Sequence, residues 1–139
     1  MDALVIDCSV TLGFILKDEQ DSFSLKTFQQ LRDGVPAYVP RHWAVEVTNG
    51  LLMAERRKRS TQADTQDALH LAQGLPVTVD DEFFPHQASH TLDLARQFNL
   101  TIYDAAYLEL AMRRRAALAT TDHDLAHAAK TAGVKVLNG

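Results

Sequence analysis

Short apolar runs alternate along the chain with longer segments in which apolar residues recur every three or four positions. The short runs predict buried strands and the longer segments predict helices. The predicted strands are residues 3–6, 37–39, 77–79, 116–119 and 134–137. The predicted helices are residues 9–16, 21–31, 41–58, 61–73, 85–98, 103–114 and 122–132. Such alternation is typical of an α/β protein with a parallel sheet covered by helices on both faces.

Capping and turn residues define the ends of these elements. Ser9 is a suitable N-cap for the first helix, Pro85 a suitable opening residue for the fifth, and either Thr101 or Asp104 caps the sixth. No repeat, low-complexity tract or linker interrupts the pattern. A length of 139 residues suits one domain, so we expect residues 1–139 to form a single domain.

Composition narrows the class of protein. Apolar residues make up 46% of the chain and charged residues 23%, which is the range of ordinary globular proteins and excludes a disordered chain. No apolar run approaches the roughly 20 residues that cross a bilayer, and the N-terminus has an acid where a secretory signal has basic residues. We therefore expect a cytoplasmic protein without membrane contact. The single cysteine, Cys8, excludes an internal disulfide and a cysteine-built zinc site.

The net charge of −4 gives the whole molecule no attraction to nucleic acid, so any such partner must be bound locally. Basic residues cluster only at 56–59 and 113–115. Both clusters close a predicted helix, where cations are favoured by the helix dipole. We interpret both as solvated helix ends.

Acidic residues follow the predicted strands. Asp7 comes directly after the first strand, Glu46 lies early in the helix after the second, Asp104 opens a helix, and Asp122 and Asp124 follow the fourth strand. Ligands of open parallel sheets bind outside the carboxyl ends of the strands. We therefore expect these carboxylates to meet at one edge, although Asp104 and Asp122 taken singly also suit N-caps.

Glu46 is the most informative of these acids. It shares a helix face with Trp43, Val47 and Leu51, so we expect it to be buried, and no Lys or Arg of its segment shares that face. A buried carboxylate needs compensation, and Asp7 raises the same requirement. A cation among the acids would supply it.

Mutual repulsion among several carboxylates favours a divalent ion, and all-oxygen ligation selects Mg²⁺ or Mn²⁺. Such an ion activates water and neutralises charge on a phosphoryl group, which predicts hydrolysis of phosphodiester bonds. The hydroxyls of Ser9 and Thr121 are placed to orient a carboxylate from the second coordination layer. Activity is then expected to fall as the pH enters the range in which carboxylates protonate.

Four ordered segments carry a family resemblance: VIDCSV, WAVEVTN, YDAAYLELA and LATTDHDLAHAA. With them the chain resembles the PIN-domain ribonucleases, and among these the VapC-type toxins of bacterial toxin–antitoxin pairs. The resemblance implies a three-layer α/β/α domain that binds Mg²⁺ or Mn²⁺ and cleaves RNA as an endoribonuclease. It assigns Asp7, Glu46, Asp104 and Asp122 as catalytic metal-site acids, with Asp124 as an additional ligand.

The resemblance also implies a homodimer and an inhibitory antitoxin whose segment lies along residues 43–73. It does not carry over the RNA target, because members of the family differ in the RNA they cut. His123, between the acids of TTDHD, departs from the family pattern, which commonly has Lys or another polar residue there.

Other functions remain open at this point. One alternative is a housekeeping RNA-processing PIN nuclease without an antitoxin. Another is a non-enzymatic Mg²⁺-binding module similar to a receiver, although its usual lysine at a strand end is absent and Lys135 falls inside the last strand. Two histidine pairs at zinc-compatible spacing, His86 with His90 and His123 with His127, are expected to face solvent, and Cys8 is expected to serve packing.

Overall fold

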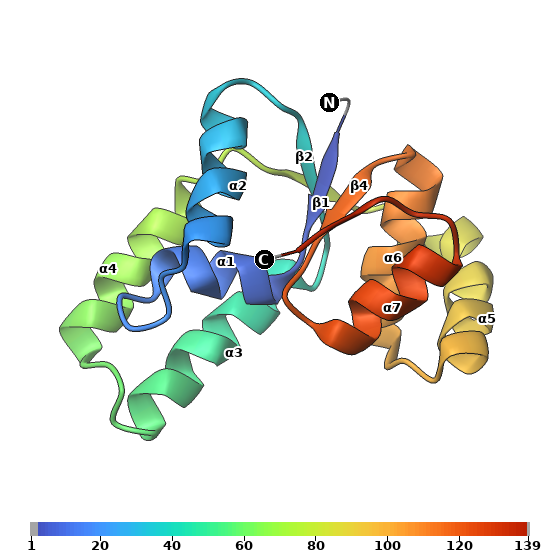
Figure 1. The fold of residues 1–139 in the computed structure, drawn as a ribbon. Coiled ribbons are helices and arrows are strands. Elements are labelled where there is room, and N and C mark those ends of the chain that lie inside the picture. Colours follow the sequence, from blue (N-terminus) through green and yellow to red (C-terminus); the bar gives the residue numbers. More distant parts are fainter. Residues whose placement is uncertain (1–2, 139) are drawn as a thin grey trace.

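A parallel five-stranded sheet forms the centre of the protein (Figure 1). The computed structural model describes residues 3–138. Its strands are β1 (Leu4–Ile6), β2 (Ala37–Pro40), β3 (Thr78–Asp80), β4 (Ala117–Ala119) and β5 (Val136–Leu137). They are arranged in the order β3-β2-β1-β4-β5, and every neighbouring pair is parallel. All five strands predicted from the apolar runs are present.

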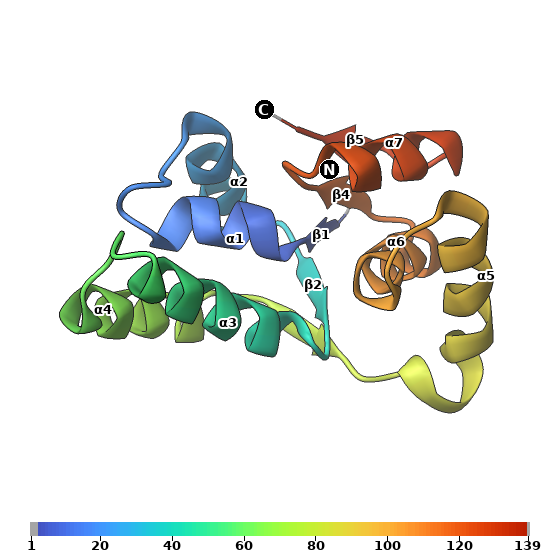
Figure 2. The ribbon, with the colours of Figure 1, turned by 90° about the horizontal axis from the view of Figure 1, so that it is seen from below.

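Seven α-helices cover the two faces of this sheet (Figure 2). On one side lie α1 (Cys8–Ile15), α2 (Ser22–Arg32), α3 (Trp43–Arg56) and α4 (Gln62–Gln73). On the other side lie α5 (Ala88–Phe98), α6 (Ile102–Arg114) and α7 (His123–Thr131). Right-handed crossovers explain the split, because the chain steps in one direction from β1 to β3 and in the opposite direction from β4 to β5. The predicted three-layer α/β/α architecture is confirmed.

The first strand is the central one. Val5 pairs with Tyr38 of β2 on one side and with Leu118 of β4 on the other. Every residue of β1 is fully buried, as is typical of a strand covered on both faces. The direction of the strand order reverses between β1 and β4, and this is the position at which open α/β sheets bind their ligands.

One helix cap differs from its prediction, and a second resolves an open alternative. The N-cap of α1 is Asp7, whose Oδ1 accepts a hydrogen bond of 3.0 Å from the backbone N–H of Val10. The predicted N-cap, Ser9, was wrong, because it already lies within the helix. Of the two candidates for α6, Thr101 is the cap: its Oγ1 accepts from the backbone N–H of Asp104 at 3.1 Å.

The helix predicted to open at Pro85 begins later. A short π-helical turn, Phe83–Gln87, precedes α5, and Phe84 within it has an extended backbone with φ −101° and ψ 145°. This extended residue interrupts the helical path, so the regular helix starts at Ala88. Among residues 3–138, no helix has both the length and the apolar character needed to span a membrane.

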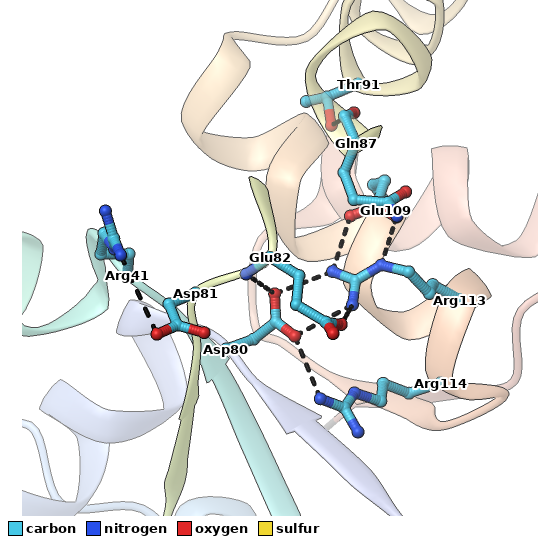
Figure 3. Close-up of polar contacts among 9 residues, drawn as sticks. All are labelled: Arg41, Asp80, Asp81, Glu82, Gln87, Thr91, Glu109, Arg113 and Arg114. Atoms are coloured by element: carbon cyan, nitrogen blue, oxygen red, sulfur yellow. Dashed lines mark hydrogen bonds and ion pairs between the residues drawn. The ribbon is translucent and has the colours of Figure 1, made fainter. Parts of the chain in front are cut away.

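An ion-pair cluster connects the end of β3 with the last turn of α6 (Figure 3). Arg113 donates to Asp80, Glu82 and Glu109, and Arg114 donates to Asp80 at 3.1 Å. The carboxylates of Asp80 and Glu109 are buried. The prediction that this basic run is only a solvated helix end was therefore wrong for Arg113 and Arg114.

The other basic run, residues 56–59, is exposed throughout, as predicted. Arg59 pairs with Asp18 at 2.9 Å and with Glu19. These exposed pairs join the turn after α3 to the turn after α1 and contribute little to stability.

Candidate functional site

Asp7 and the end of β4 form the centre of the acidic edge. Because Ile6 pairs with Ala119, the residues that follow, Asp7 and Thr120, lie side by side. The Thr120 hydroxyl donates to Oδ2 of Asp7, and it accepts from the backbone N–H of Asp122 at 2.9 Å. This chain of hydrogen bonds fixes the two acid-bearing strand ends relative to each other.

The carboxylate of Asp7 is buried and surrounded by donors. Its Oδ1 accepts from the Ser9 hydroxyl at 2.6 Å and from the backbone N–H of Val10 at 3.0 Å. Only 4% of the residue is exposed. Burial raises the pKa of Asp7 to about 6, and the charge of Asp122 adds to the rise, although the hydrogen bonds oppose it. Ionisation of the Asp7 carboxylate therefore costs free energy in this environment.

The predicted supporting hydroxyls have unequal positions. Ser9 contacts Asp7 directly and accepts a hydrogen bond of 3.0 Å from the backbone N–H of Thr121. Thr121 therefore reaches this network through its backbone N–H. The second hydroxyl on Asp7 belongs to Thr120, which the sequence analysis missed. Its position one residue beyond the fourth strand, in register with Asp7, is the signal that could have identified it.

Glu46 lies in the first turn of α3 and is half-buried. Its Oε1 accepts a hydrogen bond from the Tyr107 hydroxyl at 2.7 Å and lies 3.3 Å from Nε2 of His42. Burial raises the pKa of Glu46, but the hydrogen bonds from His42 and Tyr107 outweigh it, so that the pKa lies below its ordinary value.

The expectation that Glu46 is buried without a partner was wrong. The side chain keeps 30% of its surface exposed, and His42 sits one helical turn before it. The compensating partner on that face is a histidine and not the Lys or Arg that a buried carboxylate was expected to need. The spacing of four residues between His42 and Glu46 was the available signal. Tyr107 is 61 positions away and left no local signal.

Asp104 occupies the first turn of α6 and is partly buried. Burial raises the pKa of Asp104, and the charges of Asp122 and Glu46 raise it further. Its side chain is not the helix cap, because Thr101 has that role. An acid whose ionisation is opposed by two neighbouring acids indicates a local excess of negative charge.

Asp122 and Asp124 belong to the start of α7. Asp122 is the N-cap, and its Oδ1 accepts from the backbone N–H of Leu125 at 3.0 Å. Asp124 is exposed on the first turn. Together with Asp104, both acids line a depression of about 410 Å³ between α7 and the segment that joins α5 to α6.

The edge thus brings together acids from four segments. The charge of Asp122 contributes to the raised pKa of Asp7. The charges of Asp122 and Glu46 contribute to the raised pKa of Asp104, so each of the four charges acts on at least one of the others. Within residues 3–138, no three acidic, His or Cys side chains form a ready-made metal-binding group.

The donor set nevertheless fits a hard divalent ion. All four groups offer carboxylate oxygens, which Mg²⁺ and Mn²⁺ prefer. Burial raises the pKa values of Asp7 and Asp104 most, and a cation among the acids would counter the repulsion that adds to this rise. The chemistry of these residues therefore fits such an ion.

Two other candidate chemistries find no support. The four histidines of the two zinc-compatible pairs are exposed, as predicted. Cys8 is partly buried and packs against the core. Burial and then the charge of Glu46 raise the pKa of the Cys8 thiol to about 12, so it stays protonated and unreactive.

Comparison with known proteins identifies the family of the chain. The model of the PIN domain family matches residues 4–131. PAE2754 from Pyrobaculum aerophilum has a similar structure, with a TM-score of 0.72 and 18% identity over 98% of this chain and 84% of that one. VapBC2 from Rickettsia felis, solved bound to a promoter DNA fragment, gives a TM-score of 0.68 and 14% identity over 98% of both chains.

FitAcB from Neisseria gonorrhoeae gives a TM-score of 0.63 and 16% identity over 97% of this chain and 96% of that one. These likenesses at low identity concern the fold. The comparison with curated proteins gave no match. The family match covers most of the chain, and it includes all five acids of the edge. The chain therefore belongs to the PIN-domain family, whose members are nucleases that hydrolyse phosphodiester bonds, generally with divalent metal ions.

Proposed function

We propose that the protein is an endoribonuclease that uses Mg²⁺ or Mn²⁺ and acts as the toxin of a toxin–antitoxin pair. The observation that carries the nuclease proposal is the convergence of Asp7, Glu46, Asp104 and Asp122 at the point where the strand order reverses. RNA as the substrate rests on the resemblance of these segments to PIN-domain ribonucleases.

In this proposal the four acids hold the cation, and Asp124 is an additional ligand at the rim. A bound divalent cation neutralises charge on the phosphoryl group and promotes attack by water. Ser9 and Thr120 hold the two oxygens of Asp7, and Tyr107 holds one oxygen of Glu46. These donors fix the carboxylates in place, which lowers the cost of organising them around a cation. Thr121 supports Ser9 through its backbone.

Cleavage of a mixed pool of single-stranded and structured RNA tests the nuclease proposal. We expect cutting with Mg²⁺ or Mn²⁺, no cutting with chelator, and loss of cutting in Asp7→Asn. Asp93→Asn, an exposed acid on α5, is the matched control and should cut normally. Cutting that persists in Asp7→Asn, or in chelator, would contradict the proposed roles.

The antitoxin proposal has two kinds of support. Chains of similar fold come from the toxin–antitoxin complexes VapBC2 and FitAcB. In addition, α3 and α4 form an apolar groove of about 550 Å³ lined by Val45, Leu52 and Leu69 among others. This groove belongs to the 43–73 hairpin, where the resemblance implies that the antitoxin segment lies.

Expression in a bacterial host separates a toxin from a housekeeping nuclease. A toxin arrests growth, and co-expression of the neighbouring gene product relieves the arrest. Leu52→Glu should keep the arrest, because Leu52 is exposed and is not one of the site acids. It should lose the relief, because it places a charge in the apolar groove. Growth that continues on expression would favour the housekeeping alternative. Membership in the PIN family leaves the receiver-like alternative without support.

We also propose that residues 1–139 act as one domain and that two copies form a homodimer. Support for the dimer comes from Phe84 and Val45, which are 76% and 72% exposed beside a cavity of about 520 Å³. Light scattering should give a mass of two chains for the protein and of one chain for Phe84→Glu. An RNA substrate and the free thiol of Cys8 support a cytoplasmic location, which cell fractionation tests.

A further inference from the structure

The side chain of His42 lies between the two helices that carry Glu46 and Asp104. His42 directly precedes α3, and its backbone has φ −81° and ψ −6°. Its Nε2 is 3.3 Å from Oε1 of Glu46 and 3.1 Å from the backbone oxygen of Tyr103. Because an ionised carboxylate and a carbonyl can only accept hydrogen bonds, Nε2 must carry the proton. His42 is therefore a donor shared by the two helices.

Two aromatic rings hold the imidazole in this orientation. The ring centres of Tyr103 and Tyr107 lie 5.4 Å and 5.2 Å from that of His42, and both contacts are edge-on. Such edge-to-face contacts are favourable and directional. Only 23% of the His42 side chain is exposed. The donor is therefore preorganised by its surroundings.

The contacts on Glu46 are unequal between its two oxygens. His42 and the Tyr107 hydroxyl both approach Oε1. In the part of the chain that the structure describes, Oε2 has no hydrogen-bond donor. Glu46 is therefore anchored through one oxygen, and the other remains available to an external ligand.

The contact with Tyr103 extends this arrangement to a second acid. Tyr103 directly precedes Asp104 in the first turn of α6, which lies on the opposite face of the sheet from α3 (Figure 2). One imidazole thus links the acid-bearing turns of both helical layers. The pKa of Asp104 is raised partly by Glu46, so the relative position of these turns affects both acids.

We propose that His42, itself anchored on the backbone oxygen of Tyr103, is a positioning residue that holds Glu46 in the geometry for cation binding. The inference rests on the proposed metal site. Donors that orient metal-ligating carboxylates typically contribute tenfold or more to metal affinity. Because His42 acts through Glu46, its contribution should exist only while Glu46 is a carboxylate.

Titration of the metal-free protein with Mn²⁺, followed by electron paramagnetic resonance, tests this inference without RNA cleavage. We expect His42→Ala to weaken Mn²⁺ binding about tenfold. His42→Gln can still donate from its amide nitrogen and should retain most of the affinity. His70→Ala, an exposed histidine on α4, is the matched control and should bind as the unchanged protein does.

A double-mutant cycle shows whether the effect passes through Glu46. In the Glu46→Gln background, His42→Ala should cause no further loss of Mn²⁺ affinity. Urea unfolding of each variant separates the loss of Mn²⁺ affinity from a general loss of stability. His42→Gln would not rescue a general loss of stability.

Equal Mn²⁺ affinity of His42→Ala and the unchanged protein would overturn the inference and leave the proposed function intact. The inference would also be overturned, and the proposed function left intact, if His42→Ala lowered Mn²⁺ affinity further in the Glu46→Gln background. A failure of His42→Gln to restore Mn²⁺ binding would have the same meaning. If the unchanged protein itself binds no Mn²⁺, both the metal site and the inference fail.

Discussion

The guanidinium of Arg113 donates to both oxygens of Asp80, from Nη1 to Oδ1 at 2.9 Å and from Nη2 to Oδ2 at 2.8 Å. Arg113 also donates from Nε to the buried carboxylate of Glu109 at 2.8 Å (Figure 3). The hydrogen bond from Arg113 keeps the pKa of Asp80 below its ordinary value, although burial opposes this effect. One arginine thus compensates two buried acids.

Removal of this arginine should strongly destabilise the protein. Arg113→Ala leaves Glu109 buried without the only side chain that donates to it among residues 3–138. Asp80 keeps Arg114 and the backbone N–H of Glu82 as donors. Breaking a buried ion pair in this way typically costs about 3–5 kcal/mol of unfolding free energy. Urea unfolding measures the loss. Arg96→Ala, an exposed arginine on α5, should stay within about 0.5 kcal/mol of the unchanged protein.

The raised pKa of Asp7 predicts an unusual pH dependence of stability in the metal-free protein. Its ordinary pKa is 3.8 and its pKa in the folded protein is about 6, so the folded state binds this proton more tightly than the unfolded state does. The contribution of Asp7 to stability therefore falls as the pH rises from 3.8 through about 6. The shift corresponds to roughly 3 kcal/mol at neutral pH.

Asp7→Asn removes this titration and should be more stable than the unchanged protein at pH 7.5 in chelator. The difference should shrink toward zero as the pH falls below 3.8, where Asp7 becomes protonated in both states. Urea unfolding at several pH values measures it, with Asp93→Asn as the exposed control. An Asp7→Asn protein that is less stable at pH 7.5 would show that the hydrogen bonds of the carboxylate outweigh its burial.

Cation binding should weaken steeply in mild acid. A cation needs ionised ligands, so below pH 6 binding must displace a proton from Asp7. We expect Mn²⁺ affinity to fall by at least about tenfold per pH unit in that range, and RNA cleavage to fall with it. Calorimetric titration in buffers of different ionisation enthalpy measures both the affinity and the proton released. Constant affinity between pH 5 and pH 7 would argue against Asp7 as a ligand.

The Cys8 thiol should resist alkylation in the folded protein. Because its pKa is raised to about 12, the thiolate fraction at pH 8 is about a thousandfold below that of an ordinary thiol. Iodoacetamide should therefore label Cys8 slowly in native buffer and rapidly in urea, which mass spectrometry follows over time. Rapid labelling of the native protein would mean that the segment around Cys8 opens readily.

Local patterns were sufficient to predict the elements of the fold and their order. The apolar runs Leu4–Ile6 and Ala117–Ala119 form buried strands, because a strand covered on both faces consists almost entirely of apolar residues. Helix α2 (Ser22–Arg32) agrees to within one residue at each end with the predicted range 21–31. The acids Asp7 and Asp122 followed from the rule that parallel strands present their carboxyl ends at one edge.

Contacts between distant segments were beyond such reasoning. Arg113 and Asp80 are 33 residues apart, and Tyr107 and Glu46 are 61 apart, so neither pair belongs to a common periodic pattern. Pairs four residues apart, His42 with Glu46 and Glu109 with Arg113, were readable in principle. They define local neighbours on a helix, but only the packing of α3 and α6 on the sheet decides whether they are buried.

The central position of β1 has a consequence for the synthesis of the chain. Asp7 and its neighbour on the sheet edge, Thr120, are 113 positions apart in the sequence. Pairing of β1 with β4 closes a loop of more than a hundred residues, which is entropically slow. A nascent chain that has not yet reached β4 therefore lacks the acidic edge, and a nuclease that attacks RNA in this way would be inactive until β4 has left the ribosome.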